Sequence, residues 1–386
     1  MHSPKSLNKH LIYLLVFLFT LHLTPAIYIH SSFLEQFINK DYVGYIFSIA
    51  SVFTLVSFLV TRKFLKKYGN YKTTLYLMII SFFTSIALAL ATNIYIAVPF
   101  YILNFLATSL IFFNLDIFLE SSTKDSETGD VRGHYMTFLN LAFLLGPFIT
   151  SFVLIDHDFW KVFTLGAIIQ IPLIYILIKY LKNFKDPIYQ KPKLWKNFLK
   201  LRNNSDLLST FSCAFLLRFF FSWMIVYTPI YLINEIGFTV SQTTFIIGLA
   251  LIPFVLLEIG LGKISDKYIG EKEIMTAGFL IMGISTILIT FIDSANIVIW
   301  ATILFITRIG ATMVEIMSEI HLFKRVDAKN INIIGIFRSV RPVAYVISPI
   351  VASLLLIYID FKFLFLILGI IMLYGMRFSL SIKDTK

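Results

Sequence analysis

The sequence predicts an all-α membrane protein with twelve transmembrane helices in two pseudo-symmetric bundles of six. Three observations favour this fold: an apolar composition, twelve apolar runs of membrane-spanning length, and motifs that occur twice along the chain. Of the 386 residues, 58% are hydrophobic and only 14% are charged, whereas soluble domains carry about a quarter charged residues. Each run must be helical, because an isolated strand leaves its backbone polar groups unsatisfied in lipid.

The apolar runs are each about 20 residues long, which is the length that crosses the hydrocarbon core of a bilayer as a helix. The predicted spans are residues 11–30, 42–61, 73–91, 95–119, 133–155, 159–179, 207–233, 239–261, 273–291, 296–321, 332–357 and 361–380. The longest connection lies between the sixth and seventh spans. We therefore expect an N-terminal bundle over residues 1–181, a linker over 182–206 and a C-terminal bundle over 207–386. Apolar and basic residues alternate at helical spacing in 193–202, which predicts an amphipathic helix on the membrane surface.

The basic residues gather in alternate loops and so predict the orientation of the chain. Of the 33 Lys and Arg residues, only Lys40, Lys161 and Lys362 fall in loops on one side. Four more, Arg218, Arg308, Arg338 and Arg341, lie inside spans, and the remainder lie on the other side. Cytoplasmic loops carry the excess of Lys and Arg. We therefore expect a multi-pass protein of the inner (plasma) membrane with both termini in the cytoplasm, and we interpret the net charge as a topology signal rather than a nucleic-acid surface.

The two halves repeat with an offset of roughly 200 residues. The matched features are Thr24-Pro25 with Thr228-Pro229, Tyr68 with Tyr268, Asp116 and Glu120 with Glu315 and Glu319, Gly133 with Gly335, and the segment 142–151 with 344–353. The last pair places Gly146 and Pro147 opposite Ser348 and Pro349, and we expect Gly146, Pro147 and Pro349 to be helix-packing positions. Repeated bundles with a site near the membrane midplane are typical of secondary transporters.

Two motifs resemble those of the major facilitator superfamily. The turn Gly262-x-x-x-Asp266-Lys267-x-x-Gly270-x-Lys272 is similar to the loop signature of that family, and residues 142–151 resemble its fifth-helix signature. The chain departs from the family pattern where Arg62 and Lys66 replace a Gly and an Asp in the first half. It also has Ala142, Thr150 and Ser151 where the fifth-helix signature has glycines.

The resemblance implies that the turn at Gly262 is a cytoplasmic gate. Asp266 would cap the start of the fifth span, and Lys267 would pair with Glu319. Lys67 and Glu120 would form the weaker equivalent in the first half. A carboxylate at a helix N-terminus is favourable because of the helix dipole, and Gly262 permits close approach of two helices. The alternative is a surface cluster of charges that follows only the orientation rule.

Ionisable residues inside spans are costly and usually functional. Spans 1, 4, 7 and 10 carry His22, Asp116, Arg218, Arg308 and Glu315, whereas spans 3, 6, 9 and 12 carry none away from their ends. Arg308, Thr312, Glu315 and Glu319 share one helix face, and Ser109, Phe113, Asp116 and Glu120 form the matched face of the first half. The resemblance implies that these four spans line the central cavity.

Three interpretations of these charges remain open. Asp116 or Glu315 is a proton-binding carboxylate beside arginine; or Arg218 and Arg308 bind an anionic solute; or the charges form buried salt bridges, for example of Asp116 or Glu315 with Arg338 or Arg341. His22 is interpreted as a packed histidine rather than a proton relay. The 40 Phe and 19 Tyr residues are interpreted mainly as lipid-facing.

The predicted function is secondary active transport of a small organic solute by alternating access, with proton-coupled efflux or antiport as the main hypothesis. Uptake or exchange of an organic anion is the alternative, and a non-transporting sensor or an enzyme at the membrane interface is the alternative of another class. The sequence has no P-loop string for ATP, and its single cysteine, Cys213, excludes an internal disulfide and a cysteine-based metal site. We expect no enzyme activity, cofactor, metal or nucleic-acid partner. The expected partners are the lipid bilayer, a small-molecule substrate and protons, and the expected state is a monomer.

Overall fold

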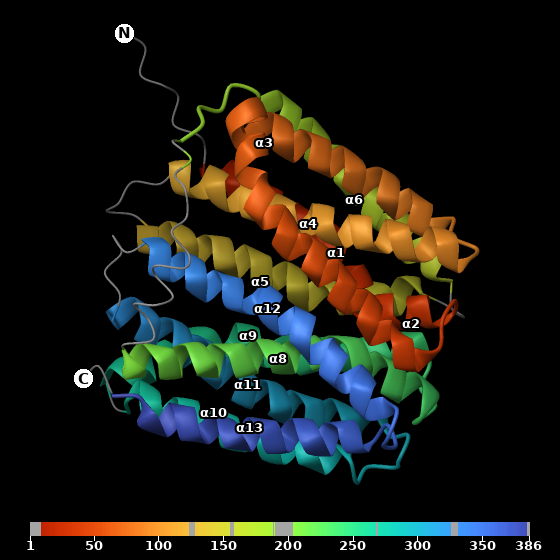
Figure 1. Cartoon of the computed structure of the whole chain (residues 1–386), viewed down its shortest axis with the longest axis vertical. Coiled ribbons are helices and arrows are strands. Elements are labelled where there is room, and N and C mark those ends of the chain that lie inside the picture. Colours follow the sequence, from red (N-terminus) through yellow and green to blue (C-terminus); the bar gives the residue numbers. More distant parts are fainter. Residues whose placement is uncertain are drawn as a thin grey trace. The chain divides into compact units, whose positions relative to one another are not determined.

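The computed structural model describes residues 9–122, 128–154, 158–187, 189, 204–267, 269–325 and 331–383. All regular secondary structure in these ranges is helical (Figure 1). Twelve segments of the described helices are long and apolar enough to cross a membrane. The all-α fold class with twelve spans is therefore confirmed. The predicted amphipathic segment 193–202 lies outside the described residues.

The helices follow the predicted apolar runs closely. They are α1 (Lys9–Ile27), α2 (His30–Glu35), α3 (Lys40–Ala89), α4 (Ile94–Ser122), α5 (Thr128–Val153), α6 (Phe159–Leu181), α8 (Ser205–Asn234), α9 (Val240–Lys267), α10 (Glu271–Ile289), α11 (Ile297–Arg325), α12 (Ile331–Leu356) and α13 (Phe363–Ser381). One element differs in kind from the expectation. The second and third predicted spans, with the basic connection between them, form the single element α3.

Residues 62–72 were expected as a loop, but they continue the helix and break it only at Gly69. Gly69 has φ 78° and ψ 165°, a left-handed conformation that glycine adopts without a Cβ penalty. Lysine is a good helix former, so the basic residues on either side carry the helix up to this point. The carboxylate of Asp186, just beyond α6, accepts the backbone N–H of Asn70 at 2.6 Å. The hydroxyl of Tyr189 donates to the same carboxylate oxygen at 2.6 Å.

Gly69→Ala is expected to destabilise the protein by more than backbone strain alone. A residue with a Cβ at positive φ and extended ψ costs about 1–3 kcal/mol, and a Cβ at Gly69 would also contact Asp186 Oδ2. Gly237→Ala is the matched control, because Gly237 has φ 86° with nothing within 4 Å of a built Cβ. Thermal unfolding in detergent should show a larger loss at Gly69. An equal loss at both positions would contradict the importance of the Asp186 contact.

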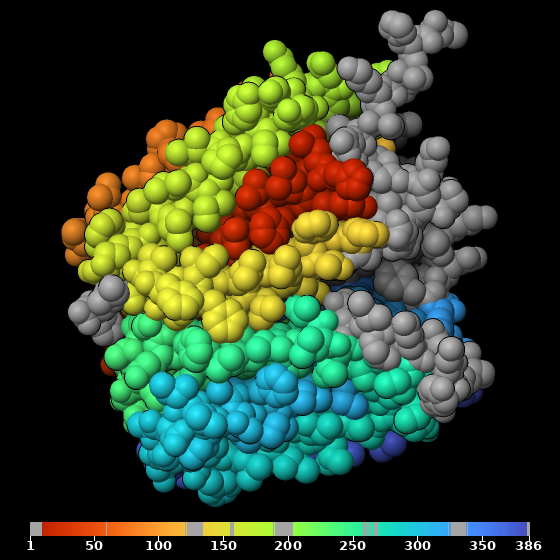
Figure 2. All heavy atoms as spheres, turned by 180° about the vertical axis from the view of Figure 1, so that it is seen from behind, coloured from red at the N-terminus to blue at the C-terminus, as the bar shows by residue number. Residues whose placement is uncertain are grey.

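The chain divides into two compact units. Unit 1 consists of Met1–Asn39 and Ile49–Gln190, and unit 2 of Lys40–Ser48 and Lys191–Lys386. In unit 1, α1 packs between α5 and α6 and also contacts α4, as the space-filling view shows for α1, α5 and α6 (Figure 2). In unit 2, α10 packs against α11 and α13, while α8 contacts α11, α12 and α13. The first residues of α3 belong to unit 2, where the hydroxyl of Ser48 donates to the carbonyl of Val346 at 2.9 Å.

Candidate functional site

The helices α8 and α11 of unit 2 are joined by an ion pair inside the span region. Arg218 Nη1 lies 2.8 Å from Glu315 Oε1, and the two side chains are 21% and 25% exposed. Glu319, one turn further along α11, also interacts electrostatically with Arg218. The predicted one-face spacing of α11 thus directs its acids toward the arginine of α8. The salt-bridge interpretation had proposed Arg338 or Arg341 as the partner of Glu315. Among the described side chains, Glu315 pairs with Arg218 of α8; the side chain of Arg338 lies outside the described residues.

Aromatic rings surround the two arginines of this face. The guanidinium carbon of Arg308 lies 5.4 Å from the ring centroid of Phe220 and 5.6 Å from that of Phe221. Arg218 lies 5.6 Å from the same Phe221 ring. Phe254 of α9 packs edge-on against Phe221 at 5.8 Å. Guanidinium groups at these distances are stabilised by the ring quadrupoles.

These phenylalanines were missed in the sequence, where the aromatic residues were interpreted mainly as lipid-facing. Phe220 is fully buried, and Arg308 is only 5% exposed. The signal that could have found them is their spacing, since Phe221 follows Arg218 by three residues and therefore shares its helix face. The hydroxyl of Thr312, on the same face, donates to the carbonyl of Arg308 at 2.7 Å within its own helix.

The matched face of unit 1 lies on α4. Asp116 is half-buried there, and Phe113, one turn before, packs edge-on against Phe58 of α3 at 5.7 Å. The hydroxyl of Ser109 donates a hydrogen bond within its own helix, to the carbonyl of Phe105 at 2.7 Å. The side chain of Glu120 lies outside the described residues.

His22 of α1 has the surroundings of a packed histidine. Its side chain is buried, its Nδ1 is hydrogen-bonded to the carbonyl of Phe19, and its ring lies 4.7 Å from the ring of Phe19. A Cβ built at Gly166 of α6 would lie 2.9 Å from the carbonyl oxygen of His22. The close approach of α6 leaves little room around this part of α1.

The protein that carries the Arg218–Glu315 ion pair matches a known family. The family model of the Major Facilitator Superfamily matches residues 10–330 and again 229–383. The chain belongs to the major facilitator superfamily. It is a multi-pass membrane transporter rather than an enzyme, and the resemblance of its loop and fifth-helix motifs is confirmed at the level of the family.

Solved structures of transporters share the fold. The nucleoside transporter NupG is similar with a TM-score of 0.73 and 14% sequence identity, over 97% of this chain and 99% of that chain. A bacterial homologue of the human lysosomal transporter Spinster, inward-facing and unoccupied, is similar with a TM-score of 0.68 and 9% identity, over 98% and 94% of the two chains. A comparison with curated protein sequences gives no significant match. At these identities the likeness concerns the fold alone.

The loop signature of this superfamily member spans the end of α9 and the start of α10. Gly262 lies within α9, which ends at Lys267. Gly270 is the N-cap residue of α10, and Lys272 is half-buried in its first turn. The side chains of Asp266 and Lys267 lie outside the described residues, so the capping of the fifth span by Asp266 and the pairing of Lys267 with Glu319 stay predictions.

Other contacts near the two loop copies were not expected. In unit 2, Glu271 is fully buried, and its Oε1 lies 2.7 Å from Lys324 Nζ at the end of α11. In unit 1, Lys67 Nζ lies 5.1 Å from the ring centroid of Tyr68. The predicted pairing of Lys67 with Glu120 stays a prediction, because the side chain of Glu120 lies outside the described residues, whereas Glu271 had no predicted role. Glu271 could have been found from its place in the first turn of a helix, where a carboxylate is favourable.

The fifth-helix motif of the superfamily is a site of close helix packing in this chain. The hydroxyl of Thr24 donates to the carbonyl of Ala142 at 3.0 Å, and the hydroxyl of Thr150 donates to the carbonyl of Pro25 at 2.7 Å. Between them, a Cβ built at Gly146 would collide with the Thr24 side chain and lie 2.7 Å from its carbonyl carbon. Pro147 lies inside α5 at this level.

The second copy of this motif uses different side chains for the same purpose. The hydroxyl of Ser348 donates to the carbonyl of Phe219 at 2.8 Å, and the hydroxyl of Tyr227 donates to the carbonyl of Pro349 at 2.8 Å. Ser348 occupies the position of Gly146 in the repeat. A hydrogen bond between α8 and α12 thus replaces the bare glycine contact between α1 and α5.

Proposed function

We propose that this transporter exchanges a small organic solute for protons, and that Glu315 is the carboxylate for which the two compete. The observation that carries the proposal is the Arg218–Glu315 ion pair at 2.8 Å, with both side chains only partly exposed. An ionised carboxylate at this depth needs a partner. Arg218 supplies that partner when neither a proton nor the solute is bound. A proton or a donor group of the solute displaces it, and their mutual exclusion produces exchange.

The solute side of the proposed site is aromatic. Phe221 lies against both Arg218 and Arg308, so displacement of either guanidinium changes what covers the ring. A planar organic solute fits such surroundings, because rings stack on aromatic faces and on guanidinium planes. The similar nucleoside transporter makes nucleosides one class to test, alongside aromatic acids and aromatic cations.

The loop charges support the proposed orientation. Because most Lys and Arg residues lie in alternate loops, we propose that both termini lie in the cytoplasm and that the membrane is the plasma (inner) membrane. Alternating access between two six-helix halves, residues 1–181 and 207–386, is the proposed movement. Asp116 is proposed as the acid of the first half that faces the same pathway, and the Asp266–Lys267 turn as its cytoplasmic gate.

A second candidate function is co-transport of an organic anion with protons. It is favoured by the two arginines that share Phe221. In this alternative the proton neutralises Glu315 and frees Arg218, whose planar guanidinium binds a carboxylate through two hydrogen bonds. The two functions differ in the direction of proton movement on solute binding. Binding releases a proton in exchange and takes one up in co-transport.

Arg308→Lys is expected to weaken binding of a planar solute about five- to tenfold while retaining the charge. Lysine keeps the cation but loses the flat surface that the rings of Phe220 and Phe221 contact. Arg341→Lys is the matched control, because Arg341 lies 5.4 Å from the Tyr345 ring on α12. Binding of uridine and benzoate, which carry planar rings, is measured by thermal shift and by isothermal calorimetry, with the tetrahedral cation tetraphenylphosphonium as a non-planar comparison. An equal loss in both variants, or none at Arg308, would contradict the proposed solute position.

A further inference from the structure

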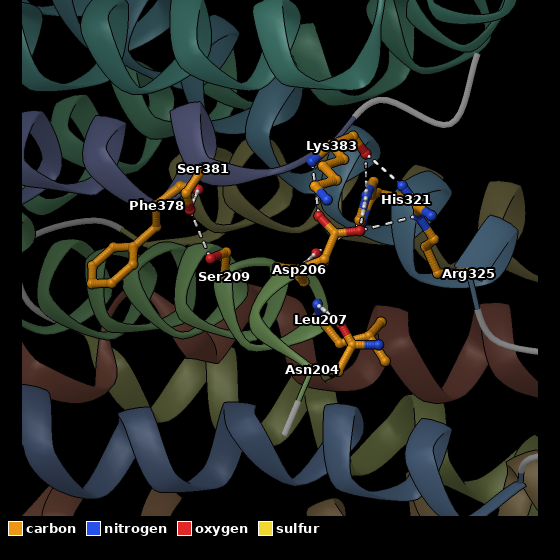
Figure 3. Close-up of polar contacts among 10 residues, drawn as sticks. Asn204, Asp206, Leu207, Ser209, His321, Arg325, Phe378, Ser381 and Lys383 are labelled. Atoms are coloured by element: carbon orange, nitrogen blue, oxygen red, sulfur yellow. Dashed lines mark hydrogen bonds and ion pairs between the residues drawn. The ribbon is translucent and has the colours of Figure 1, made fainter. Parts of the chain in front are cut away.

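A second polar cluster lies at the end of unit 2 where α8 begins and where α11 and α13 end (Figure 3). The carboxylate of Asp206 accepts the backbone N–H of Lys383 at 2.8 Å, and its other oxygen lies 3.1 Å from Arg325 Nε. Arg325 also donates to the carbonyl of Lys383 at 2.9 Å. Lys383, which follows α13, is therefore bound by the start of α8 and the end of α11.

His321 of α11 lies at the centre of this cluster and is fully buried. Its Nε2 lies 3.1 Å from the carbonyl oxygen of Lys383 and 3.6 Å from Asp206 Oδ2. Its Nδ1 lies 2.8 Å from the hydroxyl oxygen of Thr210. That hydroxyl is in turn 3.1 Å from the backbone carbonyl of Asp206. Both ring nitrogens thus have partners within unit 2.

The protons of these groups can be counted from the chemistry of their partners. A carbonyl only accepts, so Nε2 of His321 must carry a hydrogen to bond Lys383. The hydroxyl of Thr210 has one hydrogen, which goes either to His321 Nδ1 or to the carbonyl of Asp206. In the first case the ring is neutral. In the second case Nδ1 donates to the Thr210 oxygen, the ring is charged, and the network gains one hydrogen bond. Both forms fit the same positions of the heavy atoms.

We propose that His321 is a proton-binding site of this transporter, separate from Glu315, and that its charged form holds Lys383 more tightly. Histidine is the side chain whose charge ordinarily changes between pH 5 and 8. The charged ring faces the Asp206 carboxylate of α8 and the Lys383 carbonyl. The positive charge of Arg325, on the same helix, and the burial of the ring disfavour the charged form. The neighbouring charges of α10 and α11, Glu271 and Lys324, are paired with each other at 2.7 Å.

The His321 site is connected to the proposed Arg218–Glu315 site through two shared helices. The helices that it joins, α8 and α11, are the ones that carry Arg218 and Glu315. Thr210 precedes Arg218 by eight residues, which is about 12 Å along the helix. A proton on His321 therefore strengthens the contact between these helices at one end, whatever the state of Glu315. In the proposed orientation this end lies at the cytoplasm, so the site would respond to cytoplasmic pH.

Hydrogen exchange of the Lys383 amide tests the proposal without any transported solute. In the purified full-length protein in detergent, protection of this amide, corrected for the intrinsic exchange rate, should rise about tenfold between pH 8 and pH 5.5. His321→Gln keeps a donor for the Lys383 carbonyl but cannot take a proton. It should show low protection that does not change with pH. His30→Gln, at the buried histidine of α2, is the matched control and should keep the wild-type transition.

Thr210→Val provides a second variant in which the histidine is retained. It removes the acceptor that the second N–H of the charged ring needs, so the transition should move to lower pH by about one unit. Three results would overturn the proposal: protection in the wild type that is constant across this pH range, a transition that persists in His321→Gln, or an unchanged midpoint in Thr210→Val. None of these results depends on whether Glu315 binds protons.

Discussion

Glu315→Gln is expected to abolish solute accumulation driven by a pH gradient, with a loss of about 100-fold or more, while solute-for-solute exchange continues. The amide is nearly the same size as the carboxylate but cannot take up a proton or form the ion pair with Arg218. One paired charge, 25% exposed, differs between the two forms, and the cost of about 3–5 kcal/mol for breaking a fully buried pair is the upper bound for this loss. The measurement is uptake into proteoliposomes with an imposed pH gradient, compared with counterflow at equal pH.

Glu273→Gln is the control for this experiment. Glu273 is an exposed acid in the first turn of α10, so its neutralisation changes net charge without touching the α8–α11 pair. It should leave both modes of transport within about twofold of the wild type, because exposed charges contribute little. Retained pH-driven accumulation in Glu315→Gln would remove Glu315 from the coupling mechanism.

Gly146→Val is expected to destabilise the folded transporter by about 3 kcal/mol or more, the upper end of what overpacking costs. The added side chain would start 2.7 Å from the carbonyl carbon of Thr24, which is backbone and cannot rotate away. The hydrogen bonds from Thr24 and Thr150 hold α1 and α5 together on both sides of this contact. The helices must separate, and both bonds are then lost.

The measurement is the midpoint of thermal unfolding of the purified protein in detergent, together with its yield as a monodisperse species. Leu145→Val is the matched control at the neighbouring position, where the side chain is exposed. It should change the midpoint by only a few degrees. A Gly146→Val protein as stable as this control would show that α1 and α5 tolerate separation.

The twelve spans could be predicted from the sequence because a helix in lipid must be apolar for its full length. The break in α3 could not be predicted, since it depends both on local helical preference and on a contact with a distant segment. The helical preference of the lysines continued the helix through the expected loop, and Asp186 binds the backbone of Asn70, next to Gly69, from a segment 116 residues away. Local propensity is visible in the sequence, whereas a contact between distant segments is not.

Only part of the candidate site could be predicted from the sequence. Spacing placed Arg308, Glu315 and Glu319 on one face of α11, because helical periodicity is a local property. The partner of Glu315 was not predictable, since four arginines lie inside spans and only the packing of α8 on α11 selects Arg218. Phe220 and Phe221 were hidden by the abundance of phenylalanine, which gives no single ring a distinct signal in an apolar sequence.

The central claim is that a proton and the solute compete for Glu315. The most direct measurement is the number of protons exchanged with a weakly buffered solution, monitored with pyranine, when a saturating solute binds to the purified protein. The solute is the best binder among uridine, benzoate and tetraphenylphosphonium. Because binding and protonation are linked reciprocally, we predict release of up to about one proton per solute bound in the wild type and none in Glu315→Gln. Proton uptake, or equal release from both proteins, would contradict the exchange mechanism.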